Sequence, residues 1–458
     1  MNRLPIEIIR VISEYDKKLM LVLTSLNNFL YSHRKHFSIN FDFTKIDKFT
    51  TEFQINNLYN VNKLPLLNIN KDIFKIIFCK NFNDIIDDLP KETKHLTFGY
   101  DFNKETDNLP ENITHLIYGY SFNQKIYNLP KNITHLTFGN KFNQEIDDLP
   151  KSITHLTLGW YFDQRVDNLP ENILYLTFGD YFNQPIDNLP KKIIKLTFGF
   201  YFNQEIDHLP EKITRLTFGF EFNQKVDNLP KNLIHLTFGK CFNNKVDKLP
   251  ENIRYLAFGV YFNQKIDNLP YNLKHLILGY HFDQNADNLP NKITHLTFGD
   301  RFNQQVDNLP EKLTHLTFGC GFNQKTDNLP KKLISVIFGN HFNQKVDKLP
   351  ENITRLTFGN HFNQKVDGLP HKITHLIFGN HFNQKVDSLP KNITHLTFGN
   401  LFNQEINNLP KTIIHLTFGD NFNQQIDDLP KDITNVKIEK NYIHLSKKYP
   451  NINFIFFN

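Results

Sequence analysis

Several residue types and features are scarce in this chain, and each scarcity excludes a class of protein. Its 458 residues include only three cysteines, Cys79, Cys241 and Cys320, which lie far apart. Neither a disulfide framework nor a zinc site is therefore expected. No run of about 18 apolar residues occurs, so no membrane-spanning helix is expected. The 52 basic and 47 acidic residues nearly balance, which gives no nucleic-acid-binding signature.

The first residues lack the pattern of a signal peptide. Glu7, Arg10, Asp16 and Lys17 interrupt the apolar residues there, whereas a signal peptide has an uninterrupted apolar stretch. We therefore expect an intracellular protein, cytoplasmic or nuclear.

What the chain does contain is a repeat of twenty residues that runs from Phe82 to Phe422. A Leu-Pro pair recurs at 89/90, 109/110 and onward to 429/430, without insertion or deletion, which makes eighteen copies. A short period without slippage is typical of a solenoid, in which each unit stacks on its neighbours. Function must then come from positions where the repeats differ, or from segments outside the repeat.

Within one copy, the alternation Leu136–Thr137–Phe138 predicts a short, half-buried strand. Gly139 follows it, and a glycine recurs there in every full repeat. This position predicts a sharp turn with positive φ, which glycine adopts at little cost. Phe142, Ile146 and Leu149 are expected to point into the interior of the coil.

Two polar columns accompany this apolar frame. Asn143 represents a column that is Asn in sixteen copies, and stacked Asn side chains are expected to bond along the solenoid axis. Asp147 represents a column of Asp ahead of the Leu-Pro step. We expect that carboxylate to accept backbone amides of the turn. A metal-binding row is the alternative, although the spacing matches no calcium-binding repeat.

The stretch 182–186, Phe-Asn-Gln-Pro-Ile, and its equivalents resemble the FNIP repeat family over about residues 71–438. The frame Leu-Pro-x-x-Ile-x-x-Leu-x-Phe is similar to a leucine-rich repeat, so the resemblance implies a β-rich solenoid of about 18 coils. Such proteins are typical of social amoebae and giant amoebal viruses, which implies a host-cell location if the chain is viral.

Segments outside the repeat are expected to close its two ends. Residues 41–70 are interpreted as a linker and N-terminal cap, and 439–458 as a C-terminal cap. In the C-terminal cap, 442–449 predicts a short helix and 452–457 a final apolar strand. An uncovered strand edge invites aggregation, which is why both ends need a cap.

Residues 1–40 are interpreted as a small all-α segment. They resemble an F-box, and the matching residues are Leu4, Pro5, Glu7, Ile8, Ile9, Ile12, Tyr15, Asp16, Leu19, Leu23, Leu26 and Tyr31. The resemblance implies an adaptor that docks on the adaptor subunit of a cullin–RING ubiquitin ligase and holds a target protein on its repeats. The docking contacts would come from Leu4, Pro5, Ile8, Ile9, Ile12, Leu19 and Leu23. An amphipathic helical cap for the solenoid is the alternative.

The outward strand column is the first place where the repeats differ. It holds His in eleven copies and otherwise Tyr175, Lys195, Arg215, Tyr255, Ser335, Arg355 and Asn435. In leucine-rich repeats this face binds partners. A row of His also raises the possibility of metal binding, but stacked parallel side chains do not converge on one ion. A plain solvent-facing surface is the remaining interpretation.

The two residues after each glycine vary most, and we call them the loop pair. Aromatic residues are frequent there, as expected of protein-binding hot spots: Tyr100, Tyr120, Trp160, Tyr161, Tyr181, Phe200, Tyr201, Phe220, Tyr261 and Tyr280. We expect them to form one continuous stripe that binds a protein partner. Sequence drift in loops that tolerate change is the alternative.

Catalysis is not expected, because every carboxylate belongs to a periodic row or to a scattered surface position and no acid–base pair stands out. We predict no catalytic residue, cofactor or resident metal, and no nucleic-acid or membrane partner. The function predicted from the sequence is a substrate-recognition adaptor of a ubiquitin ligase. A protein-binding scaffold without ligase linkage is the alternative.

Overall fold

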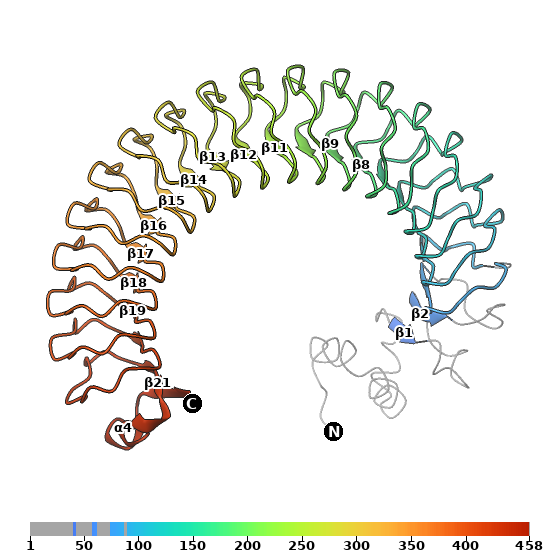
Figure 1. The fold of residues 1–458 in the computed structure, drawn as a ribbon. Helices are drawn as coiled ribbons and strands as arrows, with labels where there is room; N and C mark the ends of the chain where they lie inside the picture. Colours follow the sequence, from blue (N-terminus) through green and yellow to red (C-terminus); the bar gives the residue numbers. More distant parts are fainter. Residues whose placement is uncertain (1–39, 43–56, 62–73, 87–88, 458) are drawn as a thin grey trace, which may run out of the picture. The chain divides into compact units, whose positions relative to one another are not determined.

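The computed structural model describes residues 40–42, 57–61, 74–86 and 89–457. The F-box-like residues between Leu4 and Leu23 lie outside this range. The chain divides into two compact units, Met1–Gly219 and Phe220–Asn458, and each is described by itself. In both units short strands recur at the twenty-residue period (Figure 1).

The strands of the first unit pair side by side in parallel, in chain order. They are β1 (Asn40–Asp42), β2 (Asn57–Val61), β3 (Lys75–Phe78), β4 (His95–Thr97), β5 (His115–Ile117), β6 (His135–Thr137), β7 (His155–Thr157), β8 (Tyr175–Thr177), β9 (Lys195–Thr197) and β10 (Arg215–Thr217).

The second unit repeats the same parallel pairing from β11 to β22. Its elements are β11 (His235–Thr237), β12 (Tyr255–Ala257), β13 (His275–Ile277), β14 (His295–Thr297), β15 (His315–Thr317), β16 (Ser335–Ile337), β17 (Arg355–Thr357), β18 (His375–Ile377), β19 (His395–Thr397), β20 (His415–Thr417), β21 (Asn435–Glu439), η3 (Lys440–Tyr442), α4 (His444–Lys448) and β22 (Asn453–Phe457).

The predicted solenoid is confirmed, and its interior consists of stacked apolar columns. Leu136, Phe138, Phe142 and Ile146 are buried as the alternation indicated. The rings of Phe138 and Phe142 stack with centroids 3.9 Å apart, and Phe122 of the preceding coil stacks on Phe142 at 5.9 Å. Burial of one such ring contributes about 1.5–3 kcal/mol, so each coil is stabilised mainly by the coils beside it.

The prediction that the invariant glycine is needed for a positive φ was wrong. At Gly139 and its described equivalents φ lies outside the left-handed region, so no positive φ calls for glycine. A Cβ atom on Gly139 would instead overlap the backbone carbonyl of Gly119 in the preceding coil. Glycine recurs because consecutive coils approach one another at this point more closely than any side chain permits.

The predicted Asn ladder is confirmed. Oδ1 of Asn123 accepts the backbone N–H of Asn143 at 2.9 Å and Nε2 of Gln144 at 3.1 Å. Asp163 replaces Asn in one copy and accepts the N–H of Asn183 at 2.9 Å in the same way. The side-chain oxygen Oδ1, which Asn and Asp share, is therefore the group that matters, because it satisfies one backbone donor of the next coil.

The Asp column behaves differently from its predicted role as a cap for backbone amides. Oδ1 of Asp147 accepts Nδ2 of Asn168 in the next coil at 3.3 Å, and Asp167 accepts Nδ2 of Asn188 at the same distance. These carboxylates therefore link coils through side chains. The turn after the Leu-Pro step is closed by the backbone, as where Ile153 N–H donates to the carbonyl of Pro150 at 3.2 Å.

The ends of the array carry the segments predicted for them. At the C-terminus α4 and β22 confirm the short helix and the final strand, and β22 pairs in parallel with β21. The phenol of Tyr442 donates to the backbone carbonyl of Gln424 at 2.8 Å, which ties this cap to the last full coil. In the first unit β1 and β2 extend the sheet beyond β3.

Candidate protein-binding surfaces

The loop pair is exposed, but its aromatic side chains do not form the single stripe predicted from the sequence. Asn140 and Lys141 interrupt it in the first unit, and Lys240 and Cys241 interrupt it in the second. In the first unit Tyr100 contacts Tyr120, and Tyr181 contacts Tyr161 and Tyr201, on either side of the interruption at Asn140 and Lys141. The prediction of one continuous aromatic stripe was therefore wrong. The exposure of most of the predicted aromatic residues is confirmed.

The largest group lies in the first unit on three successive coils, and we call it the aromatic cluster. It consists of Trp160, Tyr161, Tyr181, Phe200 and Tyr201. The Tyr181 ring lies 5.0 Å from Tyr161 and 4.9 Å from Tyr201, and Phe200 lies 4.7 Å from Tyr201. Trp160, the one tryptophan of the chain, is 48% exposed. The rings of Tyr161, Tyr181, Phe200 and Tyr201 pack on one another at the surface instead of entering the core, and Trp160 is the residue before Tyr161.

The remaining predicted aromatics are engaged with cations or with each other. Tyr100 and Tyr120 stack at 4.5 Å, and Lys80 and Lys141 lie over the outer faces of the pair. A ring covered on both faces offers little new contact area to a partner. These two residues are therefore weaker anchors than the aromatic cluster.

In the second unit the predicted residues Phe220, Tyr261 and Tyr280 lie in other surroundings. Lys240 lies over Phe220 at 5.0 Å, and His281 contacts the rings of both Tyr261 and Tyr280. Tyr261 and Tyr280 therefore form a small mixed group with His281.

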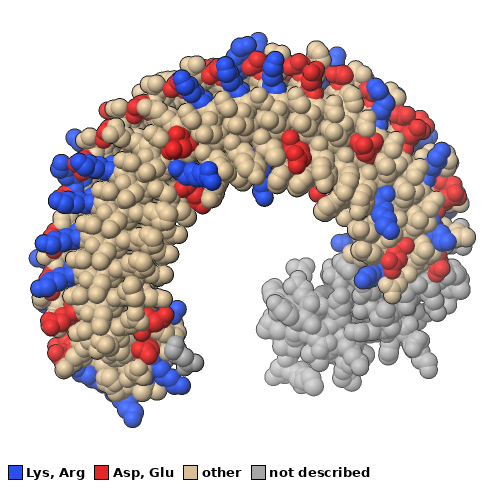
Figure 2. All heavy atoms as spheres, viewed as in Figure 1, with Lys and Arg blue, Asp and Glu red and all other residues tan. Residues whose placement is uncertain are grey.

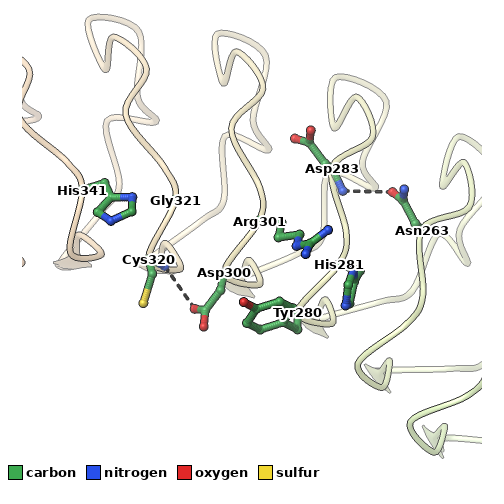
Figure 3. Close-up of a pocket in the computed structure, with 9 residues that line it drawn as sticks. All are labelled: Asn263, Tyr280, His281, Asp283, Asp300, Arg301, Cys320, Gly321 and His341. Atoms are coloured by element: carbon green, nitrogen blue, oxygen red, sulfur yellow. Dashed lines mark hydrogen bonds between the residues drawn. The ribbon is translucent and has the colours of Figure 1, made fainter.

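A shallow hollow of about 620 Å³ lies in the loops of the second unit, and the sequence interpretation missed it (Figure 3). It forms where Gly321 leaves the loop pair without a side chain between Arg301 and His341. Asp300 accepts the backbone N–H of Cys320 at 3.1 Å, and Arg301 lies over the ring of Tyr280 at 5.8 Å. The small pair Cys320-Gly321 was the signal available in the sequence. Both acidic and basic side chains line the hollow, so its charge does not favour either an anionic or a cationic ligand.

The His row of the strand face is stacked and hydrogen-bonded. Ring centroids of His95, His115, His135 and His155 are 4.2, 4.1 and 3.9 Å apart in succession. The rings of His115, His135 and His155 also contact the Thr before them: in one coil the Thr114 hydroxyl lies 2.9 Å from Nδ1 of His115.

The Thr contact determines which ring nitrogen carries the proton. The Thr114 hydroxyl donates its single proton to the carbonyl of Lys94 at 3.2 Å, so it accepts from Nδ1–H of His115. Asn435 confirms this pattern, because its side-chain N–H donates to Thr434 at 2.8 Å in the same column. Nε2 of each neutral imidazole so bonded is therefore a hydrogen-bond acceptor.

Burial in the stack lowers the pKa of several members of the row. Partial burial removes water from the His115 imidazolium, and repulsion from His95 and His135 adds to this, which lowers the pKa of His115 to about 4. Burial lowers the pKa of further members of the column as well: His95, His135, His155, His295, His375 and His395. At neutral pH these seven histidines with a lowered pKa are therefore polar but uncharged.

Charged side chains gather mainly along the outer edge of each unit, away from the strands (Figure 2). Within the described part of the chain, no three His, Cys, Asp or Glu side chains converge on a point that could hold a metal ion. In that same part, each helix is too short or too polar to span a bilayer.

Comparison with known protein families identifies the family of this repeat. The model of the FNIP repeat matches residues 102–321 and 342–441, which is more than half of the chain. The chain belongs to the FNIP repeat family. Among solved structures, CroV588 is described as a novel circular leucine-rich-repeat (LRR) protein; it is 38% identical, with a TM-score of 0.74. The match covers 90% of this chain and 74% of that one.

A more remote similarity is to YopM of Yersinia enterocolitica, at 18% identity and a TM-score of 0.44, covering 78% of this chain and 89% of that one. No curated protein matches the chain. This FNIP protein is therefore a leucine-rich-repeat-like solenoid. Solenoids of this kind present extended surfaces and typically serve as non-catalytic scaffolds that bind proteins.

Proposed function

We propose that this FNIP protein is the substrate-recognition adaptor of a cullin–RING ubiquitin ligase, with its repeats holding the target protein. The observation that supports target binding is the aromatic cluster around Trp160 and Tyr181, five rings on three successive coils of a rigid array. Folding does not require these rings, because the columns of Phe138 and Phe142 already fill the interior.

Exposed rings on rigid elements suit an anchoring role. Large aromatic side chains concentrate binding energy at protein interfaces, and truncating one hot-spot residue typically costs about 2 kcal/mol or more. Such a loss corresponds to roughly thirtyfold in affinity. Because Tyr161, Tyr181 and Tyr201 already pack on one another, little conformational freedom of these side chains is lost when a partner covers them.

A pulldown from amoebal cell lysate tests the surface. The wild-type protein, the double variant Trp160→Ala/Phe200→Ala and a matched variant with Asn340, Asn360 and Asn380 changed to Ala are compared. The matched variant alters the same loop position in the second unit, where no such cluster lies. We expect target recovery to fall at least tenfold in the aromatic variant only. Equal recovery from all three folded proteins would contradict the proposal.

The ligase link rests on the F-box resemblance of residues 1–40. In it, Leu4 and Pro5 together with Ile8 and Ile9 would dock on the adaptor subunit of the ligase. We expect the full-length protein to co-purify with that subunit, and Leu4→Ala/Pro5→Ala to abolish co-purification, because each docked apolar side chain contributes about 1–3 kcal/mol. Unchanged circular dichroism would show that the solenoid remains folded.

A binding scaffold without ligase linkage is the second candidate. Target recovery that depends on Trp160 while no ligase subunit co-purifies would favour it. Both candidates place the protein in the cytoplasm or nucleus, since the ligase and its targets are intracellular.

A further inference from the structure

The strand face carries no negative charge. In the seventeen three-residue strands β4 to β20, no position is Asp or Glu, and neither is the residue directly before any of these strands. Basic residues occur at the same positions: Lys94, Lys195, Arg215, Arg254, Lys274 and Arg355. The chain as a whole has nearly equal numbers of acidic and basic residues, so the absence of carboxylates is specific to this face.

The fold itself does not exclude carboxylates there. The outward column accepts residues as different as Tyr175, Lys195 and Ser335 without any change in strand length. Glu and Lys are disfavoured in strands to a similar degree, so strand propensity does not admit one and reject the other. The loop pair of the same coils accepts Asp180 and Asp300. Negative charge is therefore tolerated nearby and is missing from the strands β4 to β20.

The positive charge is densest in the first unit. Lys195 and Arg215 are register partners on β9 and β10, and both are exposed. Like charges on directly opposed strand positions destabilise a sheet. Neither side chain forms an ion pair within the described residues. The repulsion between Lys195 and Arg215 destabilises the fold, and no ion pair in the described part of the chain offsets it. This favours a binding role for the two cations.

Lys195 lies on a coil of the aromatic cluster, and Arg215 lies on the next coil. Strand β9 ends at Thr197, and Phe200 of the cluster follows three residues later, a separation of at most about 10 Å along the chain. Tyr175 is the register partner of Lys195 on the other side. One extended ligand can therefore reach the rings and both cations.

We propose that the basic pair Lys195/Arg215 binds an acidic segment of the target protein, whose apolar side chains contact the aromatic cluster. The inference rests on the proposed target-binding function and names the chemistry of the partner. In the second unit Arg254 and Lys274, each directly before a strand, are also exposed on successive coils.

A polypeptide fits this face better than a nucleic acid does. Duplex DNA carries a negative charge about every 1.7 Å, whereas the cations here are isolated pairs among neutral residues, in a chain of net charge +5. The His rows present hydrogen-bond acceptors, which suit the N–H groups of a peptide and repel phosphate oxygens. The carboxylates of an extended peptide can pair with Lys195 and Arg215. Its backbone N–H groups can donate hydrogen bonds to the His rings.

Fluorescence anisotropy with three labelled probes tests the inference on the full-length protein. The probes are a 15-residue peptide of alternating Glu and Leu, the same peptide with Gln in place of Glu, and a 15-nucleotide single strand of thymidine. The variants are Lys195→Glu/Arg215→Glu and the matched Lys131→Glu/Lys151→Glu, which reverses two exposed charges on neighbouring coils outside the strand face.

We expect the Glu peptide to bind the wild-type protein at least tenfold more tightly than the Gln peptide does. Affinity should fall at least tenfold in Lys195→Glu/Arg215→Glu and less than twofold in the matched variant. Absent binding of the Glu peptide, equal losses in both variants, or tighter binding of the thymidine strand would each overturn the inference. The lysate pulldown with Trp160→Ala/Phe200→Ala is scored separately, so failure of target binding is distinguished from failure of acidic-segment binding.

Discussion

At the scale of single residues, the twenty-residue period is maintained by contacts that leave no room for substitution. Gly379 shows the constraint: a Cβ atom there would lie 2.7 Å from Cα of Asn360 and overlap the carbonyl of Gly359. Gly368, eleven residues earlier, is under a weaker constraint, since the nearest neighbour of its Cβ would be Cα of Asp347 at 3.1 Å, which a shift of a few tenths of an ångström relieves. Other coils carry side chains at that position, such as Ser388.

Gly379→Ala is therefore expected to lower the free energy of unfolding by at least about 2 kcal/mol, because the added methyl forces two coils apart. Gly368→Ala should change it by less than about 0.5 kcal/mol. Urea denaturation followed by circular dichroism compares the two. Similar stability of both variants would show that the coils can separate at Gly379 without loss.

The Asn ladder offers a second test with an internal control. Oδ1 of Asn323 accepts the backbone N–H of Asn343 at 2.9 Å and Nε2 of Gln344 at 3.2 Å. Asn323→Ala removes the acceptor and should cost about 1 kcal/mol. Asn323→Asp should be nearly neutral, because Asp283 already holds this position and accepts the N–H of Asn303 at 2.9 Å. Equal thermal stability of the Ala and Asp variants would exclude the ladder as a stabilising feature.

At the scale of the elements, strands of three residues are too short to be stable alone, and their side chains stack across coils. The His row couples this stacking to pH. Folding lowers the pKa of His115 from its ordinary value near 6.5 to about 4. Between those values the unfolded chain binds the proton more readily than the folded one. The stabilisation is therefore complete above pH 6.5 and is lost as the pH falls toward 4.

We expect the melting temperature of the protein to fall between pH 7 and pH 4.5. The fall should be several degrees smaller in the variant His115→Asn/His135→Asn. Asn is the appropriate replacement because Asn435 makes the same bond to its preceding Thr without titrating. Differential scanning calorimetry across this pH range gives the comparison. Parallel curves for the two proteins would rule out the His row as a source of acid sensitivity.

At the scale of the whole molecule, stability should be close to a sum over identical neighbours. Removing residues 342–361 joins His341 to Phe362 and recreates the loop found in the native chain, since His361 also precedes Phe362. We expect this deletion to keep the circular dichroism spectrum and to shift the melting temperature by only a few degrees. Removing residues 342–351 instead shifts the repeat out of phase and should unfold part of the array. Equal damage from both deletions would contradict a modular array.

The sequence alone determined whatever depends on the period. Leu136, Phe138 and Phe142 could be placed in the core, and the Asn ladder could be predicted, because identical residues must face one another when equal coils stack. The end segments could be predicted from the loss of the pattern. The roles of residues 1–40 and of the aromatic loop residues as binding sites remain predictions.

Only the tertiary structure decided what depends on distances between coils. Gly139 is required by a carbonyl twenty residues earlier, and Asp147 bonds to a side chain twenty-one residues later. The proton position on His115 follows from a Thr that also bonds the preceding coil. The grouping of the aromatics and the hollow at Gly321 depend on which unlike coils become neighbours. A repeat pattern predicts which residues align from coil to coil. The distance between two coils determines which of their atoms are in contact.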